Sequence, residues 1–410
     1  MKRDLFDLSI PDGGAYTDLL VKRPDYQRLV TFVENKKEPL YSWFYYKEGF
    51  ARELVWKLLD EMGVPEGGTV FDPFCGTGNT LLACMQREYN SIGCEILPLG
   101  AFVSNTKLQQ DYDVEKLAEE IRRINSFKFG ETSLKWVDPG FIDINRAFSR
   151  YARNDLLFFK EKIIWVEDEK IRNFMMLALL SIVLQASNAK RDGGVIRIVK
   201  KKHLAPVRYL FKNKLKRMFR DVKKMQHHDC FAKAYLGDAR SFEPDEKVDA
   251  CITSPPYLNY IDYTKLYGLE LALLLDRDEI SQLRKMSLRS HIGAESRGKT
   301  VDSELLRQTL ENINDPLTKS PEIVGDYFAD MNQVMKKVHG GLKKGGKFAL
   351  VVGNACLPGT TIDVDLILAE LGQKMGFEVK EILVANVRWC DVHGITKDRP
   401  ARESIVVLEK

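Results

Sequence analysis

The segment Thr253-Ser254-Pro255-Pro256-Tyr257 has side chains and a backbone suited to holding an amino group. Two consecutive prolines remove two backbone donors and leave carbonyl oxygens on a stiff chain. Acceptors without competing donors suit an –NH2 group, and the Tyr257 ring offers a flat face for stacking. The alternative interpretation is a proline-stiffened surface turn. A short buried strand expected over 248–253 leads into the segment and favours the binding loop.

A glycine loop lies far upstream, in Phe71-Asp72-Pro73-Phe74-Cys75-Gly76-Thr77-Gly78. It follows an expected strand over 69–72 and precedes helical periodicity from Leu81 to about Glu88. Such a turn lets backbone approach a ligand closely and presents free N–H groups at the start of a helix. The spacing matches neither GxGxxG nor a phosphate-cradling loop with Gly-Lys-Ser/Thr. The residues expected to contact a cofactor here are Asp72, Phe74, Gly76, Thr77 and Gly78.

Two acidic residues end the neighbouring expected strands. Glu95 ends a strand over 90–95, where a carboxylate can accept hydrogen bonds from both ribose hydroxyls of an adenosine. Asp238 ends a strand over 234–238, where it suits the amino group of an adenine. The alternative for Asp238 is an ordinary turn aspartate.

In this order, FDPFCGTG, GCE, LGD and TSPPY resemble the motif series of the DNA amino-methyltransferases. The resemblance covers most of 41–110 and 234–410. It implies S-adenosyl-L-methionine as cofactor, Thr253 as a further cofactor contact and no metal. The catalytic loop that it implies is Ser254, Pro255, Pro256 and Tyr257.

The target base is less closely defined. Ser-Pro-Pro-Tyr is similar to the cytosine-N4 branch, whereas adenine-N6 enzymes more often carry Asp or Asn in place of Ser254. The cofactor motif precedes the catalytic motif, the reverse of many cytosine-N4 enzymes, so an adenine or an RNA base stays open. The resemblance implies methyl transfer to N4 of a flipped cytosine in double-stranded DNA. It also implies protection from a cognate restriction endonuclease that forms no stable complex with this chain.

Three further function classes fit less well. A protein amide methyltransferase would not need the cations described below. A dinucleotide-dependent oxidoreductase is disfavoured, because this sequence lacks the third glycine of the GxGxxG motif. A non-catalytic nucleic-acid-binding protein would explain the cations but not the paired motifs.

The periodicity predicts an α/β fold with a doubly wound, mostly parallel sheet, as in the Rossmann-like S-adenosylmethionine-dependent methyltransferases. Further strands are expected over 348–353, 377–385 and 405–408, a helix over 363–374 and a buried helix over 174–184. The expected parts are an irregular N-terminal arm (1–40), a catalytic domain (41–112 and 231–410), a helical insertion that recognises DNA (113–230) and a second helical excursion (265–335).

Cations gather in the expected insertion and would attract a phosphate backbone, although a solvated helix face is the alternative. They are Lys200, Lys201, Lys202, Arg208, Lys212, Lys214, Lys216, Arg217, Arg220, Lys223 and Lys224, with Asp221 as the one acid among them. A second contact region is expected at Arg284, Lys285, Arg289, Arg297 and Lys299. Other candidates for the site are the aromatic segment 41–50, Asn188, Lys190, Arg191, Asp192, Asn259, Asp262 and Tyr263.

The composition is ordinary for a globular enzyme, with 44% hydrophobic and 29% charged residues in 410 and a net charge of +4. The seven cysteines are odd in number and form no CxxC, so we expect free thiols in a reducing cytoplasm. The N-terminus has no apolar run typical of a signal peptide. The most apolar stretch, 174–184, is too short to cross a bilayer, so no membrane partner is expected.

Overall fold

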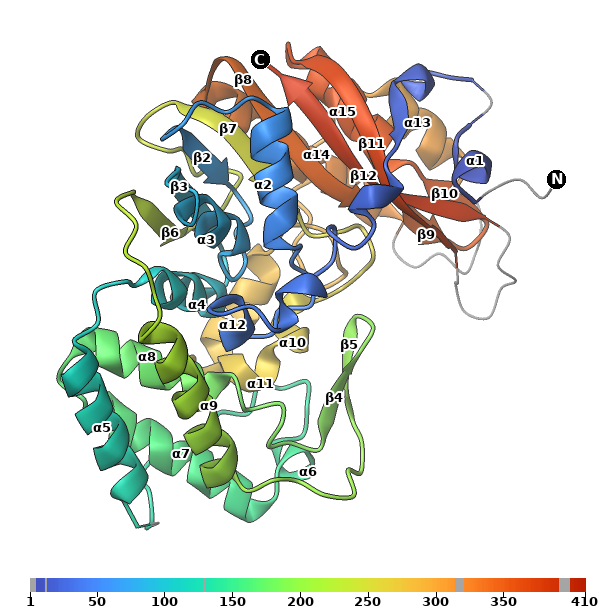
Figure 1. Cartoon of the computed structure of the whole chain (residues 1–410). Coiled ribbons are helices and arrows are strands. Elements are labelled where there is room, and N and C mark those ends of the chain that lie inside the picture. Colours follow the sequence, from blue (N-terminus) through green and yellow to red (C-terminus); the bar gives the residue numbers. More distant parts are fainter. Residues whose placement is uncertain (1–4, 12, 129, 314–320, 391–398) are drawn as a thin grey trace.

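A computed structural model describes residues 5–11, 13–128, 130–313, 321–390 and 399–410, and an eight-stranded sheet lies at its centre (Figure 1). The strand order is β1-β11-β12-β8-β7-β2-β3-β6. β12 runs antiparallel to β11 and to β8, and all other pairs are parallel. The doubly wound, mostly parallel α/β sheet is therefore confirmed. Its strands are β1 (Leu20–Lys22), β2 (Thr69–Asp72), β3 (Asn90–Glu95), β6 (Ala232–Leu236), β7 (Val248–Thr253), β8 (Leu342–Gly353), β11 (Glu378–Trp389) and β12 (Pro400–Glu409).

The strands that carry the motifs follow the sequence pattern closely. β2, β3 and β7 have the predicted bounds, whereas β6 begins and ends two residues early, so Asp238 lies in the loop that follows it. The arm before residue 40 was expected to be irregular, and this is wrong at β1. Leu20 to Lys22 pair with Ile382 to Val384 along the open edge of β11. Three residues are too few to show strand periodicity. They form a strand because the edge of β11 offers unpaired N–H and C=O groups.

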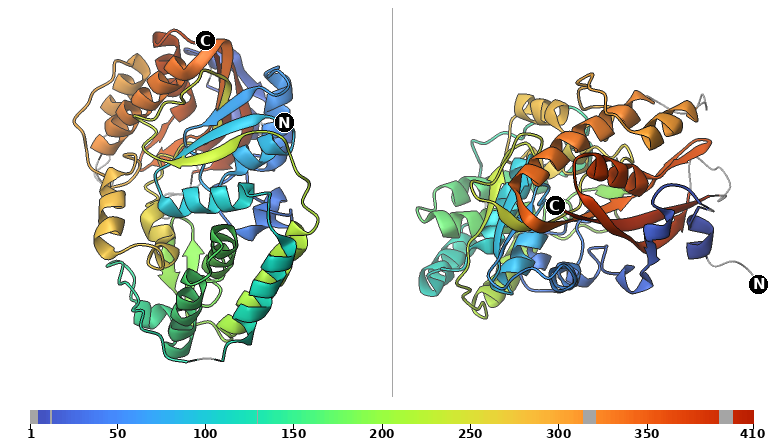
Figure 2. Two further views of the ribbon diagram at one scale, coloured as in Figure 1. Left: turned by 90° about the vertical axis from the view of Figure 1, so that its left-hand side faces the viewer. Right: turned by 90° about the horizontal axis from the view of Figure 1, so that it is seen from above.

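Helices cover both faces of the sheet (Figure 2). Phe348, Leu350 and Val352 of β8 face one core, together with α14 and α15. Ala349 and Val351 face the opposite core, together with α2. Successive residues of a strand point to opposite faces, so strands buried on both sides read as continuous apolar runs. The covering helices are α2 (Arg52–Glu61), α3 (Asn79–Met85), α4 (Pro98–Leu108), α14 (Glu322–Gly341) and α15 (Val364–Lys374).

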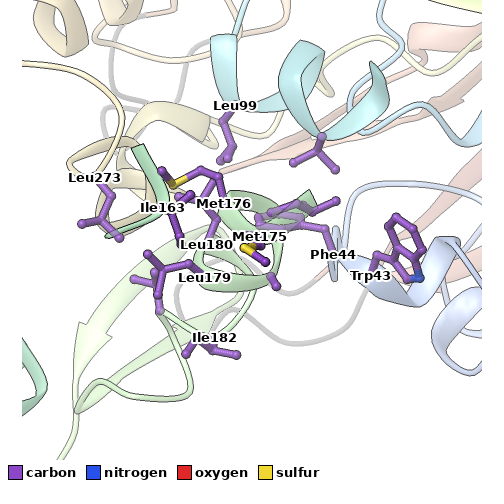
Figure 3. Close-up of a cluster of buried hydrophobic side chains, with 14 of the residues drawn as sticks. Trp43, Phe44, Leu99, Ile163, Met175, Met176, Leu179, Leu180, Ile182 and Leu273 are labelled. Atoms are coloured by element: carbon purple, nitrogen blue, oxygen red, sulfur yellow. The ribbon is translucent and has the colours of Figure 1, made fainter. Parts of the chain in front are cut away.

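The chain between β3 and β6 forms mainly helices, which lie below the sheet in Figure 1. They pack on the rest of the molecule through a continuous apolar core (Figure 3). Met175 and Met176 of α8 belong to the same buried cluster as Leu99 of α4, Trp43 and Phe44. The predicted helix over 174–184 is buried as expected but ends at Leu180. The helices are α5 (Val114–Ser126), α6 (Ile144–Ala147), α7 (Arg150–Ile164), α8 (Glu169–Leu180) and α9 (Val207–Val222).

One feature of this region was not foreseen from its helical periodicity. β4 (Ala189–Asp192) and β5 (Val195–Ile198) form an antiparallel hairpin around Gly193 and Gly194. Later in the chain the expected second helical excursion holds several short helices before α14. They are α10 (Tyr263–Leu266), α11 (Gly268–Leu271), α12 (Arg277–Met286) and α13 (Glu304–Glu311). Further elements are α1 (Leu5–Ser9), β9 (Ala355–Leu357) and β10 (Thr360–Ile362), and short 3-10 helices lie between residues 17 and 43.

The cysteines depart from expectation at one pair. Cys356 in β9 and Cys390, just after β11, form a disulfide with a Cα–Cα distance of 5.7 Å. Their separation of 34 residues hides the pairing in the sequence, because only the fold brings these two segments together. The other five cysteines are free thiols, as predicted. In the part of the chain that the structure describes, no helix has the length and apolarity to cross a bilayer.

Candidate active site

A cavity of about 350 Å³ lies at the carboxyl ends of β2, β3 and β7. From β2 the chain passes to β3 on one side, whereas β7 pairs with β2 on the other side. Open α/β sheets bind ligands at such a switch point, and the volume is in the usual range of small-molecule sites. Ten predicted site residues line the cavity: Asp72, Phe74, Gly76, Thr77, Glu95, Asp238, Ser254, Pro255, Pro256 and Tyr257.

The other two predicted site residues, Thr253 and Gly78, support the lining from behind. The Thr253 hydroxyl donates to Asp72 Oδ1 at 2.5 Å, and the Thr80 hydroxyl donates to Asp72 Oδ2 at 2.5 Å. The amide of Phe74 also donates to Asp72 Oδ1. Burial raises the pKa of Asp72 to about 6, against the lowering effect of these three donors. Asp72 thus ties the end of β7 to the glycine loop and to α3.

The glycine loop uses its glycines for conformation and for close approach. Gly76 and Gly78 have φ values of +53° and +77°, in the left-handed region that favours glycine. A Cβ on Gly78 would lie 2.9 Å from the Ser104 side chain, and one on Gly76 would lie 3.1 Å from the Tyr46 ring. Any side chain at these positions would therefore push the loop away from α4 or from Tyr46.

Glu95 is held in place by backbone donors beside this loop. Its Oε2 accepts from the amide of Gly76 at 2.9 Å, and its Oε1 accepts from the amide of Leu97 at 2.8 Å. Each carboxylate oxygen has a further lone pair that can accept from a ligand hydroxyl. Burial raises the pKa of Glu95 to about 7, although both backbone donors lower it.

Asp238 lines the same cavity with Arg240 as its partner. The Arg240 guanidinium donates to both Asp238 oxygens, at 2.9 Å to Oδ1 and 2.6 Å to Oδ2. Arg240 also pairs with Asp330 of α14 at 2.7 Å. The Asp238 carboxylate is therefore fixed in orientation, and sequence reasoning did not anticipate this arginine.

The predicted catalytic loop has a partner from the far end of the chain. The Tyr257 hydroxyl donates to Glu403 Oε1 of β12 at 3.0 Å, and a Cβ on Gly353 would lie 2.9 Å from the Tyr257 ring. The Asn386 amide donates to the other Glu403 oxygen at 3.4 Å. Burial raises the pKa of Glu403. These contacts hold the plane of the Tyr257 ring at the cavity wall.

Several lining residues escaped the sequence analysis, among them Glu403, Arg388, Asn79 and His291. Of these, only Asn79 had a local signal, because it directly follows the predicted glycine loop. The others belong to segments whose local pattern is that of ordinary strands and loops.

Some of the additional site candidates line the cavity and others do not. Tyr46 to Phe50 line the cavity as expected, whereas Trp43 and Phe44 are buried in the core. Asn259 and Tyr263 line it, but Asp262 instead caps α10 and pairs with Arg284 at 2.6 Å. Four other candidates lie outside the cavity lining found in the described residues. They are Asn188, Lys190, Arg191 and Asp192.

Only some of the cations that were predicted to lie on the surface are exposed. Lys201 and Lys214 turn inward to the carbonyls of Leu184 and Ser42, and Arg208 donates to that of Phe127. On α9 the exposed cations are Lys212, Lys216, Arg217 and Arg220, followed by Lys223 and Lys224.

Arg289 was expected to contact DNA, and this is wrong. Its side chain is 8% exposed and donates to the Ile292 carbonyl at 3.0 Å and to Asp326 at 3.3 Å. The guanidinium donors are thus used inside the protein, and a charge pattern cannot show this in advance. Arg297 and Lys299 remain exposed.

The cavity has features that fit a cofactor. Within the described ranges, the Thr77 hydroxyl and the Asn79 carbonyl oxygen are buried without a hydrogen-bond partner, although both residues line the cavity. Buried polar atoms normally have hydrogen-bond partners, so these two atoms are suited to hydrogen bonds with a bound ligand. In the same ranges no three His, Cys, Asp or Glu side chains gather to hold a metal.

Proteins of known family are similar in sequence to this chain. Residues 21–98, which contain the glycine loop and Glu95, match the N6/N4 methyltransferase family model, described as "DNA methylase". The chain is related to the N6/N4 DNA methylases. The type II methyltransferase M.BsoBI of Geobacillus stearothermophilus is 27% identical, over 88% of this chain and 83% of its own. The type II methyltransferase M.AvaI of Nostoc sp. is 28% identical, over 87% of this chain and 83% of its own.

Among solved structures, the glycopeptide N-methyltransferase MtfA matches with 9% identity and a TM-score of 0.30, covering 88% of this chain and 95% of that one. The chain is thus similar to DNA methyltransferases, and this similarity implies S-adenosyl-L-methionine as the cofactor, as the motifs did. If it is bound in this cavity, that cofactor would supply a methyl group on a sulfonium.

Cofactor affinity should depend on pH through Glu95. The ionised carboxylate is a much stronger acceptor for two hydroxyls than the neutral carboxyl group, and a raised acid pKa means that the proton is retained up to about pH 7. The dissociation constant of S-adenosyl-L-methionine should therefore rise about tenfold as the pH falls from 8 to 6. Titration calorimetry at several pH values measures this change.

Glu95→Gln is the matched variant, since it keeps the shape and loses the titration. It should bind more weakly at pH 8 and show a flatter pH profile. The nearby Asp72 and Lys107, with pKa values of about 6 and 7, are unchanged in this variant and set the remaining slope. An unaltered profile in Glu95→Gln would remove Glu95 from the ribose site.

Proposed function

We propose that this enzyme methylates the exocyclic N4 amine of a cytosine at a specific site in double-stranded DNA. The observation that carries the proposal is a shared cavity. The acceptor loop from Ser254 to Tyr257 and the cofactor residues from Asp72 to Glu95 face the same space. A target amine held by the first group lies beside a methyl donor held by the second.

The loop is proposed to activate the amine by accepting hydrogen bonds from its two N–H groups. The lone pair of an aromatic amine is delocalised into the ring, which makes the nitrogen a poor nucleophile. Hydrogen bonds from the amino group to Ser254 Oγ and to the Pro255 carbonyl would localise that lone pair on nitrogen. The catalysis is then mainly positioning, because the reacting atoms are held in line and no covalent enzyme intermediate is needed.

Tyr257 is proposed to stack on the target base. A base within a duplex must leave the helical stack to reach such a cavity, and aromatic rings commonly receive it. The hydroxyl bond to Glu403 and the contact with Gly353 support this role, because they keep the ring from turning. The Ser254 side chain supports cytosine as the base, following the resemblance to the N4 branch.

We place DNA recognition in the helical insertion, 113–230. Its exposed cations support this placement, since phosphate contacts supply much of the affinity of DNA-binding proteins. We further propose a type II restriction–modification role, in which the methyl mark protects DNA from an endonuclease that binds the same site independently. The type II relatives support this role.

The product decides between the candidate bases. The purified enzyme is incubated with S-adenosyl-L-methionine and unmethylated genomic DNA, and the DNA is digested to nucleosides for mass spectrometry. We expect N4-methylcytosine. N6-methyladenine instead would contradict the cytosine assignment, and methylation of RNA but not of DNA would contradict the duplex substrate.

A further inference from the structure

The β4–β5 hairpin stands at the rim of the cavity. A Cβ on Gly194, in its turn, would lie 2.4 Å from Ile261 Cγ1, and Ile261 lines the cavity. Gly193, with a φ of +61°, completes a two-residue turn of the kind that glycine pairs favour. In Figure 1 the hairpin projects from the insertion toward the half of the molecule that carries the sheet.

The inward face of the hairpin anchors it to the wall of the site. Arg191 pairs with Glu270 at 2.7 Å and donates to the Leu266 carbonyl at 3.0 Å. Its guanidinium lies 4.0 Å from the centre of the Tyr267 ring, and Tyr267 stacks on Tyr46 at the cavity. A lone two-stranded hairpin is marginally stable in water, so these contacts explain its fixed position.

The outward face of the hairpin is exposed and cationic. Strand register places Lys190 opposite Arg197 and Asp192 opposite Val195, and all four residues are exposed. Like charges directly opposite each other destabilise a strand pair. Asp192 lies 3.5 Å from Arg197 but is itself 51% exposed, so water screens this pair. Lys200 and Lys202, also exposed, continue the cationic surface beyond β5.

We propose that this outward face binds phosphates of the target duplex beside the base that enters the cavity. The inference rests on the proposed function and narrows DNA recognition to one element. A phosphate between Lys190 and Arg197 would relieve the repulsion between the two cations. Phosphate binding would therefore explain why like charges lie opposite each other in this hairpin. Anchoring through Arg191 and Gly194 would then set the distance from the bound strand to the catalytic loop.

The test compares two double variants, each lacking two positive charges. Lys190→Ala/Arg197→Ala removes the proposed contacts. The control, Lys336→Ala/Lys344→Ala, removes one exposed cation from α14 and one from the amino-terminal end of β8. Binding to a duplex that the wild-type enzyme methylates is measured by fluorescence anisotropy over a series of salt concentrations. Calorimetry with S-adenosyl-L-methionine and thermal unfolding check that both variants are folded.

We expect the hairpin variant to bind the duplex about tenfold more weakly and to lower the slope of log K against log[salt] by about 2, since each phosphate contact contributes about 0.9. Its cofactor affinity should equal that of wild type, and the control variant should change neither quantity. A wild-type slope in the folded hairpin variant, or an equal loss in the control, would overturn the inference. Failure of the proposed function would look different, because the wild-type enzyme would then form N6-methyladenine in DNA or methylate no DNA, whereas the hairpin inference is judged from duplex binding.

Discussion

Ser254→Ala should lower kcat for DNA methylation by about 100-fold or more, the size expected when one preorganised hydrogen-bonding group is lost from a transition state. The alanine methyl group cannot accept a hydrogen bond from the target amine, so the nitrogen lone pair stays delocalised. Ser254 lines the cavity, and its replacement by a smaller side chain leaves the neighbouring cofactor residues in place. The dissociation constant of S-adenosyl-L-methionine should therefore stay close to the wild-type value.

Single-turnover methylation with a radiolabelled cofactor measures this effect separately from product release. Ser281→Ala, an exposed serine of α12, serves as the matched control and should keep wild-type kinetics. Tyr257→Phe and Tyr257→Ala separate the ring from its hydroxyl. The alanine variant should lose most activity, whereas the phenylalanine variant keeps the stacking face and loses the hydroxyl with its bonds to Glu403 and Ser254. Full activity in both Ser254→Ala and Tyr257→Ala would refute the catalytic loop.

Asp365→Ala should lower the free energy of unfolding by about 3–5 kcal/mol, as expected when one partner of a buried ion pair is removed. Asp365, at the start of α15, is fully buried and pairs with Arg402 of β12 at 2.8 Å. It also accepts from the Ser404 hydroxyl at 2.8 Å. Among the described residues, the substitution leaves the buried Arg402 with Asp363, at 2.8 Å, as its remaining carboxylate partner.

The pair also has a consequence for the site. Arg402 and Ser404 both bond to Asp365, so Glu403 between them points to the other face of β12, where it meets Tyr257. Urea unfolding measures the loss of stability. Glu378→Ala breaks an exposed pair with Lys380 on β11 and should leave the midpoint unchanged. A comparable midpoint for both variants would show that the buried network contributes little.

The sequence by itself determined the elements that surround the cofactor motifs. β2, β3 and β7 are short, apolar and bounded by glycine, proline or acidic residues, so their local pattern is sufficient to place them. The motifs also predicted most of the cavity lining, because residues that end adjacent parallel strands meet at one edge of the sheet. The nature of the cofactor followed from these motifs and their resemblance.

The tertiary structure alone decided which distant segments meet. Glu403 reaches Tyr257 across 146 residues, because the strand order places β12 beside β8. Arg289 turns inward to Asp326 of α14, and Cys356 bonds to Cys390, because the fold brings these distant segments together. The β4–β5 hairpin is too short to show strand periodicity and is held by Arg191 and the cavity rim. Local periodicity reports only whether a residue is buried, whereas its partner depends on how the strands and helices are ordered in space.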